Sequence, residues 1–178
     1  MITLGTGVGG GIIINGKILA GSQGAGGEIG HALVVRGEEE KCNCGNHGCL
    51  EQYASATRIV RVAGRVLAAS EDDSTLRELQ NITAKDVLDA FKAGDAVAVR
   101  IMEYVGDLLG GAIAGFTTVV DPEAIVIGGG VSKAGQPLID CIEKYYQRYA
   151  FSSCKETPIV LATLGNDAGI YGAAKMVL

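Results

Sequence analysis

The first twenty residues alternate short apolar runs with glycine and polar turns. Residues 2–4, 10–14 and 17–20 are rich in Ile and Leu, and Asn15-Gly16 separates the last two runs. Asn-Gly is typical of a type I′ turn, because both central residues of that turn take a positive φ. The pattern therefore predicts three strands at the start of the chain, with the last two joined as an antiparallel hairpin.

Beyond residue 54 the spacing of apolar residues changes from strand-like to helical. Apolar residues recur three and four positions apart, which predicts helices that each bury one face. Thr83 and Asp86 have the spacing of a capping box, so a short helix should begin there. The expected helices cover 55–70, 83–93, 95–119, 136–149 and 167–177, the last with Asp167 as its N-cap, and the expected later strands cover 124–127 and 158–163.

The order of these elements predicts an α/β fold around a mixed sheet of about five strands, flanked by helices. A helix between the two late strands is the usual crossover of a parallel pair, whereas the opening hairpin is antiparallel. Residues 21–54 show no periodic pattern and are expected to form a loop-rich insertion. The length of 178 residues is enough for one domain with a sizeable core.

Composition and charge exclude several classes of function. With 48% hydrophobic and 20% charged residues the chain is ordinary for a soluble protein, and no apolar run approaches the ~18 residues of a membrane span. A net charge of −5 without a basic stripe argues against contact with nucleic acid, and Glu38-Glu39-Glu40 predicts a solvated loop. Five cysteines without a secretion signal indicate a reducing cytoplasm. Cys141 and Cys154 stand alone and are expected to be ordinary core or surface cysteines.

Two glycine clusters follow predicted strands. Gly5, Gly7 and Gly10 have the spacing of a dinucleotide fingerprint, but a strand and a hairpin follow where that motif needs a helix, and no Walker A ending is present. The Gly5-Thr6-Gly7 turn exposes N–H groups that suit phosphate, or it is a turn without a ligand. Gly128-Gly129-Gly130 either admits a flat ligand beyond a strand or is a plain strand-to-helix turn. Together the two clusters indicate a nucleotide.

Three cysteines lie within eight residues, at Cys42, Cys44 and Cys49. A closed tetrahedral zinc site needs a fourth ligand. His31 is favoured over His47, because His47 lies inside the short loop between Cys44 and Cys49. Four protein ligands leave no open coordination position, so the zinc would be structural. The alternative is three buried free thiols.

The same loop would carry two carboxylates. Glu28 lies three residues before His31, and Glu51 lies two residues after Cys49. A metal would hold both carboxylates close to the imidazole. Carboxylates accept hydrogen bonds from sugar hydroxyls, so the group indicates a sugar site, although either glutamate alone would be read as a solvated surface charge.

These motifs occur together, in the same order, in one known family. The stretches LGTGVGGGIIINGK, GAGGEIGH, CNCGNHGCLEQYASAT and IVIGGGVS resemble the ROK family (repressor, open reading frame, kinase), and their wording is most similar to its bacterial glucokinases. The resemblance spans nearly the whole chain. It implies a ribonuclease-H-like, actin-like ATPase lobe and ATP- and Mg-dependent phosphorylation of the 6-hydroxyl of a hexose.

The resemblance also implies a role for each motif. Gly5-Thr6-Gly7 corresponds to the second phosphate-binding loop and Gly128-Gly129-Gly130 to the adenosine-binding segment. His31 would bind zinc through one ring nitrogen and a sugar hydroxyl through the other, so that the metal fixes its tautomer. The implied sugar contacts are Glu28, His31 and Glu51, and the implied zinc ligands are His31, Cys42, Cys44 and Cys49.

The chain departs from the family in one respect. The family's Asp-x-Gly-Gly-Thr first phosphate loop and its Asn-Asp pair, which carries the general base, do not occur here. Neither Asp121 nor Asp167 is a persuasive substitute for that base. Residues 1–178 are therefore expected to be the C-terminal lobe of a two-lobed kinase, with a zinc-binding substrate loop at about 21–54. Alone the lobe should be inactive, because phosphoryl transfer needs both substrates positioned.

Two other functions stay open at this point. One is a sugar-sensing repressor of the same family, with its DNA-binding part elsewhere, and the other is a catalytically incomplete sugar-binding module. The intact phosphate loops favour the kinase. Glucose is the expected hexose, ahead of mannose and N-acetylmannosamine. A homo-oligomer, most simply a dimer, is also expected, without contact to a membrane.

Overall fold

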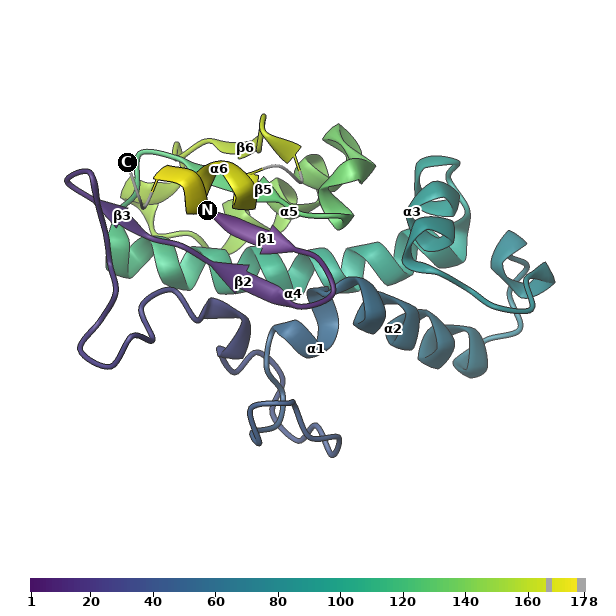
Figure 1. Ribbon diagram of the computed structural model, residues 1–178. Helices are drawn as coiled ribbons and strands as arrows, with labels where there is room; N and C mark the ends of the chain where they lie inside the picture. Colours follow the sequence, from purple (N-terminus) through teal and green to yellow (C-terminus); the bar gives the residue numbers. More distant parts are fainter. Residues whose placement is uncertain (166–167, 176–178) are drawn as a thin grey trace.

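The computed structural model describes residues 1–165 and 168–175, and six strands and six α-helices lie in those ranges (Figure 1). The strands are β1 (Ile2–Leu4), β2 (Val8–Gly10), β3 (Ile13–Ile14), β4 (Lys17–Ile18), β5 (Ile125–Gly128) and β6 (Ile159–Leu161). The α-helices are α1 (Glu51–Ala54), α2 (Ala56–Ala69), α3 (Ala84–Lys92), α4 (Ala96–Val120), α5 (Gln136–Tyr149) and α6 (Ala168–Lys175). Four 3₁₀ helices lie wholly within the described residues: η1 (Ile29–His31), η2 (Thr75–Glu78), η3 (Val131–Ala134) and η4 (Ser152–Cys154).

The main sheet has four strands in the order β2-β1-β5-β6. β1 pairs antiparallel with β2 and parallel with β5, and β5 pairs parallel with β6. The α/β class and the mixed sheet are therefore confirmed. The antiparallel hairpin predicted at Asn15-Gly16 is formed by β3 and β4 outside this sheet. The sheet is mixed because β1 and β2 form another antiparallel hairpin. The turn of that hairpin is Gly5-Thr6-Gly7, because β1 and β2 lie on either side of it.

The sheet is one strand smaller than the sequence predicts. The strand expected over 10–14 is divided: β2 ends at Gly10 in the main sheet, and β3 pairs with β4 in a separate two-stranded ribbon. The pairing extends one residue beyond β2, because the Gly11 N–H donates to the Met1 carbonyl at 3.0 Å. The three consecutive glycines that end at Gly11 offer no side chain to pack, which weakens any further pairing. The Asn15-Gly16 turn is present, with φ of 51° and 72°, as a type I′ turn requires.

The expected helices are found with small shifts at their ends. The capping box is formed, because the Thr83 hydroxyl accepts the Asp86 N–H while the Asp86 carboxylate accepts the Thr83 N–H. Asp95 caps α4 by accepting two backbone N–H groups. Residues 51–54, placed in the loop by sequence, form α1. Both ends of the predicted last helix, Asp167 included, lie outside the described residues.

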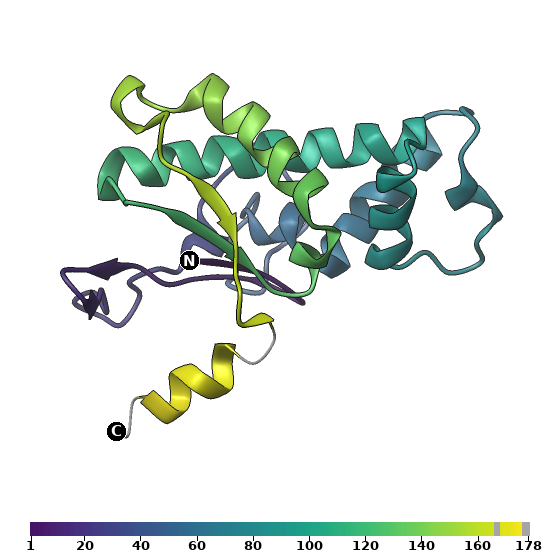
Figure 2. The ribbon, with the colours of Figure 1, turned by 90° about the horizontal axis from the view of Figure 1, so that it is seen from above.

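Helices α4 and α5 run side by side over one face of the sheet (Figure 2). Glycines of α4 allow this close contact, because a Cβ at Gly110 would lie 2.8 Å from Tyr145 Cβ and a Cβ at Gly106 would lie 2.5 Å from Cys141 Sγ. Leu4, Ile127 and other apolar side chains of the sheet are buried in one core with those of the helices. Within 1–165 and 168–175, no helix has the length and apolar character needed to cross a membrane.

Candidate functional site

The two glycine clusters lie side by side at one edge of the sheet. In the parallel pair of β1 and β5, Thr3 is opposite Gly128, so both strands end at the same place. Gly129 has a φ of 87°, and a Cβ there would lie 2.4 Å from the Leu4 carbonyl oxygen. The structure thus brings Gly128-Gly129-Gly130 against the start of Gly5-Thr6-Gly7, at the carboxyl ends of parallel strands, where open α/β sheets bind ligands.

The Gly5-Thr6-Gly7 turn is hydrogen-bonded to the first two residues of α2. The Gly5 carbonyl accepts the Ala56 N–H at 2.8 Å, and the Thr6 carbonyl accepts the Thr57 hydroxyl at 3.4 Å. These bonds leave the turn facing an open hollow of about 380 Å³. The hollow is lined by Thr3, Gly5, Thr6, Gly7, Val8, Gly9 and Glu51.

The side chains of one histidine and three cysteines come together in the loop that precedes α1. His31 Nδ1 lies 3.7 Å from Cys42 Sγ, and Cys44 Sγ lies 3.6 Å from Cys49 Sγ. All four ligand atoms lie within 4.8 Å of one another. Ligands of a tetrahedral zinc, at bond lengths of ~2.0–2.3 Å, stand roughly 3.6–3.8 Å apart. The donor set and its spacing therefore fit a zinc ion.

Tight turns bring the cysteines together. The Cys42 N–H donates to the Asn46 carbonyl at 2.7 Å, and Gly45 takes a φ of 92° inside that turn. Gly48 takes a φ of 75°, and a Cβ there would lie 1.8 Å from the Val35 carbonyl oxygen, so only glycine fits. The chain can reverse at these two glycines, and Cys49 then lies beside the segment that follows His31, where it forms an isolated β-bridge with Leu33.

His47 takes no part in the cluster. It is exposed and forms an isolated β-bridge with Lys41 on the rim of the loop. Burial raises the pKa of the Cys49 thiol to about 12, whereas the backbone N–H of Asn46 lowers the pKa of the exposed Cys44 thiol. A metal cation would favour the thiolate at both positions.

The second ring nitrogen of His31 points to a carboxylate. Nε2 lies 3.8 Å from Glu28 Oε2, while Nδ1 faces Cys42. The side chains of His31 and Glu28 are 34% and 64% exposed, so a polar ligand can reach both. The family resemblance implies that one ring nitrogen of His31 binds the metal and the other a sugar hydroxyl, and this role stays a prediction.

Glu51 joins the cysteine loop to the glycine turn. It is the first residue of α1 and lies two positions after Cys49. Its Oε2 accepts the Val8 N–H at 3.0 Å, directly after Gly7. Glu51 therefore lies in the hollow beside the turn, on the same side of the molecule as the glycine clusters.

The solvated loop predicted for residues 38–40 is wrong at Glu38, whose side chain is only 3% exposed. Its carboxylate accepts two hydrogen bonds from Arg65, at 3.0 and 3.1 Å, and others from Arg61 and from the Tyr53 hydroxyl. The bonds from Arg65 are the main reason that the pKa of Glu38 falls well below its usual range. The two arginines and the tyrosine come from α1 and α2, far along the chain, so a local charge run did not reveal them.

The side chain of Gln52, which the sequence did not single out, also joins two parts of the loop through hydrogen bonds. Its Oε1 accepts the Cys49 N–H at 3.1 Å, and its Nε2 donates to the Glu40 carbonyl at 2.9 Å. Gln52 is 1% exposed. It therefore links a candidate metal ligand to the acidic segment through one buried amide.

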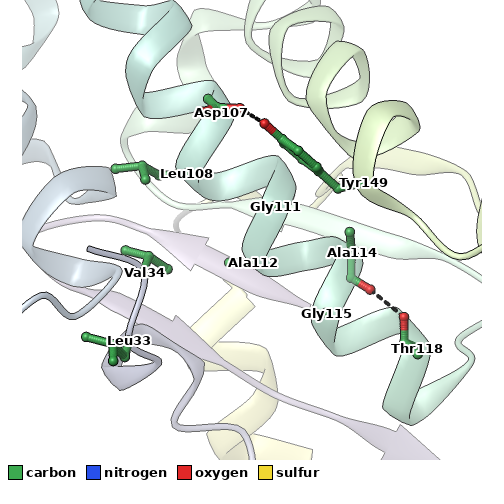
Figure 3. Close-up of a pocket in the computed structure, with 10 residues that line it drawn as sticks. All are labelled: Leu33, Val34, Asp107, Leu108, Gly111, Ala112, Ala114, Gly115, Thr118 and Tyr149. Atoms are coloured by element: carbon green, nitrogen blue, oxygen red, sulfur yellow. Dashed lines mark hydrogen bonds between the residues drawn. The ribbon is translucent and has the colours of Figure 1, made fainter. Parts of the chain in front are cut away.

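A separate groove of about 470 Å³ runs along α4 (Figure 3). Figure 3 shows Leu33 and Val34 on one side of α4 and Tyr149 on the other, where the Tyr149 hydroxyl donates to Asp107 at 2.6 Å. The lining is mainly apolar and small, and it includes none of the predicted site residues. The groove is larger than the hollow beside Glu51, yet the candidate chemistry lies at the hollow.

Asp121 is far from the candidate site. It ends α4 in the left-handed region, with a φ of 46°, and comes before the first residue of β5. The glycine cluster begins at Gly128, the last residue of the same strand. Asp121 therefore lies at the opposite edge of the sheet and cannot act on a ligand at the glycine clusters.

A parallel β1–β5 pair beside an antiparallel β2, with glycine turns at one edge, is the arrangement of an actin-like ATPase lobe. A crystal structure of a ROK family glucokinase from Streptomyces griseus, in complex with glucose and AMPPNP, matches it with a TM-score of 0.88 and 36% identity, over 98% of this chain and 58% of that one. The model of the ROK family matches residues 1–178. The chain belongs to the ROK family.

Relatives within the family differ in what they do. A glucokinase of Halalkalibacterium halodurans is 44% identical over 99% of this chain, and an N-acetyl-D-glucosamine kinase of Pasteurella multocida is 33% identical over 99%. The DNA-binding transcriptional dual regulator NagC of Escherichia coli is 36% identical over 96% of this chain. The chain spans 55%, 58% and 41% of these relatives. It thus covers about half the length of the kinases that it matches.

Proposed function

We propose that this chain is the C-terminal lobe of an ATP-dependent sugar kinase that phosphorylates a hexose, with glucose as the first candidate. The observation that carries the proposal is the meeting of both glycine clusters and Glu51 at one edge of the sheet, beside the loop with His31 and Glu28. The kinases among the relatives support it, since they cover nearly all of this chain.

In this proposal the nucleotide lies across the two glycine clusters. The N–H groups of Thr6 and Gly7 bind phosphate oxygens, while the Gly5 N–H donates to the Gly7 carbonyl at 2.9 Å and shapes the turn. Gly128-Gly129-Gly130 lets the adenosine approach the end of β5. Mg²⁺ enters with ATP and neutralises the phosphate charge during transfer. The AMPPNP bound to the Streptomyces griseus relative supports an adenine nucleotide as the donor.

The sugar lies between Glu28, His31 and Glu51. Carboxylate oxygens accept hydrogen bonds from its hydroxyls, and His31 Nε2 takes part while Nδ1 faces the cysteines. Zinc, bound by His31, Cys42, Cys44 and Cys49, would contribute only structure, by fixing the loop and the imidazole tautomer. None of the five cysteines forms a disulfide, which supports a reducing cytoplasm as the place of action.

The proton of the attacking hydroxyl is expected to go to a base outside these 178 residues. Asp121 lies at the wrong edge of the sheet, and Asp167 lies outside the described residues. We therefore expect a coupled assay with glucose and ATP to show no significant turnover for the 178-residue chain, and normal turnover for the protein from the complete coding sequence. Turnover by the short chain would refute the two-lobed mechanism, and no turnover by the long one would refute the kinase.

A sugar-responsive repressor is the second candidate, because NagC covers 96% of this chain. The two functions separate in one comparison with the complete protein. A kinase converts ATP to ADP in proportion to sugar, whereas a repressor releases its operator DNA on binding sugar without using ATP. A protein that binds glucose and does neither would be a catalytically incomplete binding module.

The identity of the hexose and the oligomeric state are further parts of the proposal. A panel of glucose, mannose, N-acetylmannosamine and N-acetylglucosamine, ranked by kcat/KM, tests glucose. Homo-oligomer formation, most simply a dimer, is supported by apolar side chains left on the surface, of which Ile13, Ile18 and Val119 are 71%, 71% and 86% exposed. Sedimentation equilibrium of the complete protein tests it, and a monomer at all concentrations would refute it.

A further inference from the structure

The backbone of Val8 is held by both sides of the proposed sugar pocket. Its N–H donates to Glu51 Oε2 at 3.0 Å. Its carbonyl oxygen faces Gly30, which lies between Glu28 and His31, and a Cβ at Gly30 would come within 2.0 Å of that oxygen. One residue at the end of the glycine turn therefore contacts both segments that carry the sugar contacts, through its N–H on one side and its carbonyl on the other.

Gly7 provides the space that the Glu51 carboxylate occupies. A Cβ at Gly7 would lie 2.4 Å from Glu51 Oε2 and 3.4 Å from its Cδ, whereas a Cβ at Gly5 would meet nothing within 4 Å. The absence of a side chain therefore serves a different purpose at each of the two glycines. Gly5 leaves room for a ligand, while Gly7 leaves room for a side chain from the cysteine loop.

Only one of the two Glu51 oxygens is used in this contact. Oε1 has no hydrogen-bond partner within residues 1–165 and 168–175, and the side chain lines the hollow beside the turn. A carboxylate with one oxygen on a backbone N–H and one open to a hydroxyl can bind a sugar and hold a loop at the same time.

We propose that Glu51 is a positioning residue that couples the sugar pocket to the phosphate-binding turn through the Val8 N–H. The inference rests on the proposed function, which supplies the two ligands. A sugar hydroxyl on Oε1 fixes the carboxylate, and the fixed carboxylate fixes the end of the turn that receives the phosphates. Coupling of this kind is reciprocal, so sugar should raise nucleotide affinity by the same factor as nucleotide raises sugar affinity.

Gly7→Ala tests the bridge directly. Because the group in its way is the end of a flexible side chain, the variant should fold while Glu51 turns aside and Val8 loses its acceptor. We expect the amide of Val8 to exchange with deuterium at least about tenfold faster, as loss of a hydrogen bond to a charged group implies. Gly11→Ala is the matched control, because a Cβ there meets nothing within 4 Å, and it should exchange like the wild type.

Two substitutions of Glu51 separate the two roles of its carboxylate. Glu51→Gln keeps an acceptor for Val8, so exchange at Val8 should stay within a few-fold of the wild type. Glu51→Ala removes the acceptor and should match Gly7→Ala. If Val8 exchanges at the wild-type rate in both Gly7→Ala and Glu51→Ala, the bridge does not exist and the proposal is overturned.

The coupling itself is measured by calorimetry on the complete protein, as the ratio of the glucose Kd without and with AMPPNP. We expect a ratio of about five or more in the wild type and in Gly11→Ala, and a ratio near one in Gly7→Ala. A merely structural role for Glu51 would leave this ratio unchanged, and that result would overturn the proposal. A wild type that binds no glucose would refute the proposed function, whereas the exchange data would still decide the bridge.

Discussion

Helix α4 and the loop of residues 28–50 are stabilised by different kinds of interaction. Eleven of the 25 residues of α4 are buried, and most of these are apolar. In the loop only five of 23 residues are buried, and three of these are Gly30, Gly48 and Leu50. The loop is held instead by the bonds of Glu38 to α2 and by the amide of Gln52, and a zinc ion at the His/Cys cluster would add to them. The proposed sugar contacts lie in and next to the loop, so the site should depend on chelators and pH in ways that the core does not.

The largest expected effect lies in the core. Leu109 of α4 is fully buried, so Leu109→Ala should lower the free energy of unfolding by about 2–5 kcal/mol, through lost burial and the cavity left behind. Urea unfolding measures it. Val119→Ala, on the same helix but 86% exposed, should change the free energy by less than about 0.5 kcal/mol. Similar losses in both variants would contradict the assignment of α4 to the core.

The next largest loss of stability is expected at the His/Cys cluster. Cys44→Ser removes one of four candidate ligands, and an equal share of the ~10–16 kcal/mol typical of structural zinc suggests a loss on the order of 3 kcal/mol in metal-dependent stability. Zinc content and the melting temperature should fall together. Cys154→Ser is the control, since Cys154 is buried outside the cluster and should leave zinc content unchanged. A chelator should abolish the difference between Cys44→Ser and the wild type, and a metal-free protein with unchanged melting would defeat the zinc assignment.

Glu38→Gln should lower the free energy of unfolding by about 1–3 kcal/mol, because it leaves Arg61 and Arg65 without their carboxylate. The neighbouring Glu39→Gln is the matched control, since Glu39 is exposed. Chemical denaturation near pH 7 measures both. Equal stability of the two variants would show that the loop is as solvated as its sequence suggests.

Acid should erase the effect of Glu38. Its pKa is lowered in the folded protein, so it contributes stability that is fully present above the unfolded value of about 4.3 and is lost as the pH falls below that value toward the folded pKa. The difference in stability between wild type and Glu38→Gln should therefore be constant above about pH 5 and shrink steadily below about pH 4. A difference that grows on acidification would contradict the pKa shift.

The smallest effect should be local to α3. Thr83→Ala removes one half of the capping box and should cost about 1 kcal/mol. Asp86→Ala removes the other half, and the double variant should lose less than the sum of the two, because both act on one pair of bonds. Thermal unfolding measures the three variants. Zinc content should be the same in all of them, since the cap lies outside the loop, and a fall in zinc would contradict the separation of the two regions.

Local pattern was enough to predict most elements. Hydrophobic spacing gave α2 through α5 and both late strands to within a few residues, and the Thr83–Asp86 and Asn15-Gly16 signals are realised in detail. The split between β2 and β3 was not foreseen, because pairing depends on which strand lies alongside and not on local sequence. α1 was also missed, since four residues are too few for a periodic signal.

For the candidate site, the sequence determined the types of residue and their grouping. Closely spaced cysteines indicate a metal site, and glycines after strands indicate a ligand-binding turn. Both signals can be read from the sequence, because the donor atom and the backbone freedom are properties of single residues. The sequence also favoured His31 over His47 as the fourth ligand. The tertiary structure brings His31, and not His47, to the three cysteines, through two turns that reverse the chain. It also buried Glu38 and placed Glu51 against Val8, since both contacts join residues far apart in sequence. Such pairings arise from packing, which no single stretch of residues encodes.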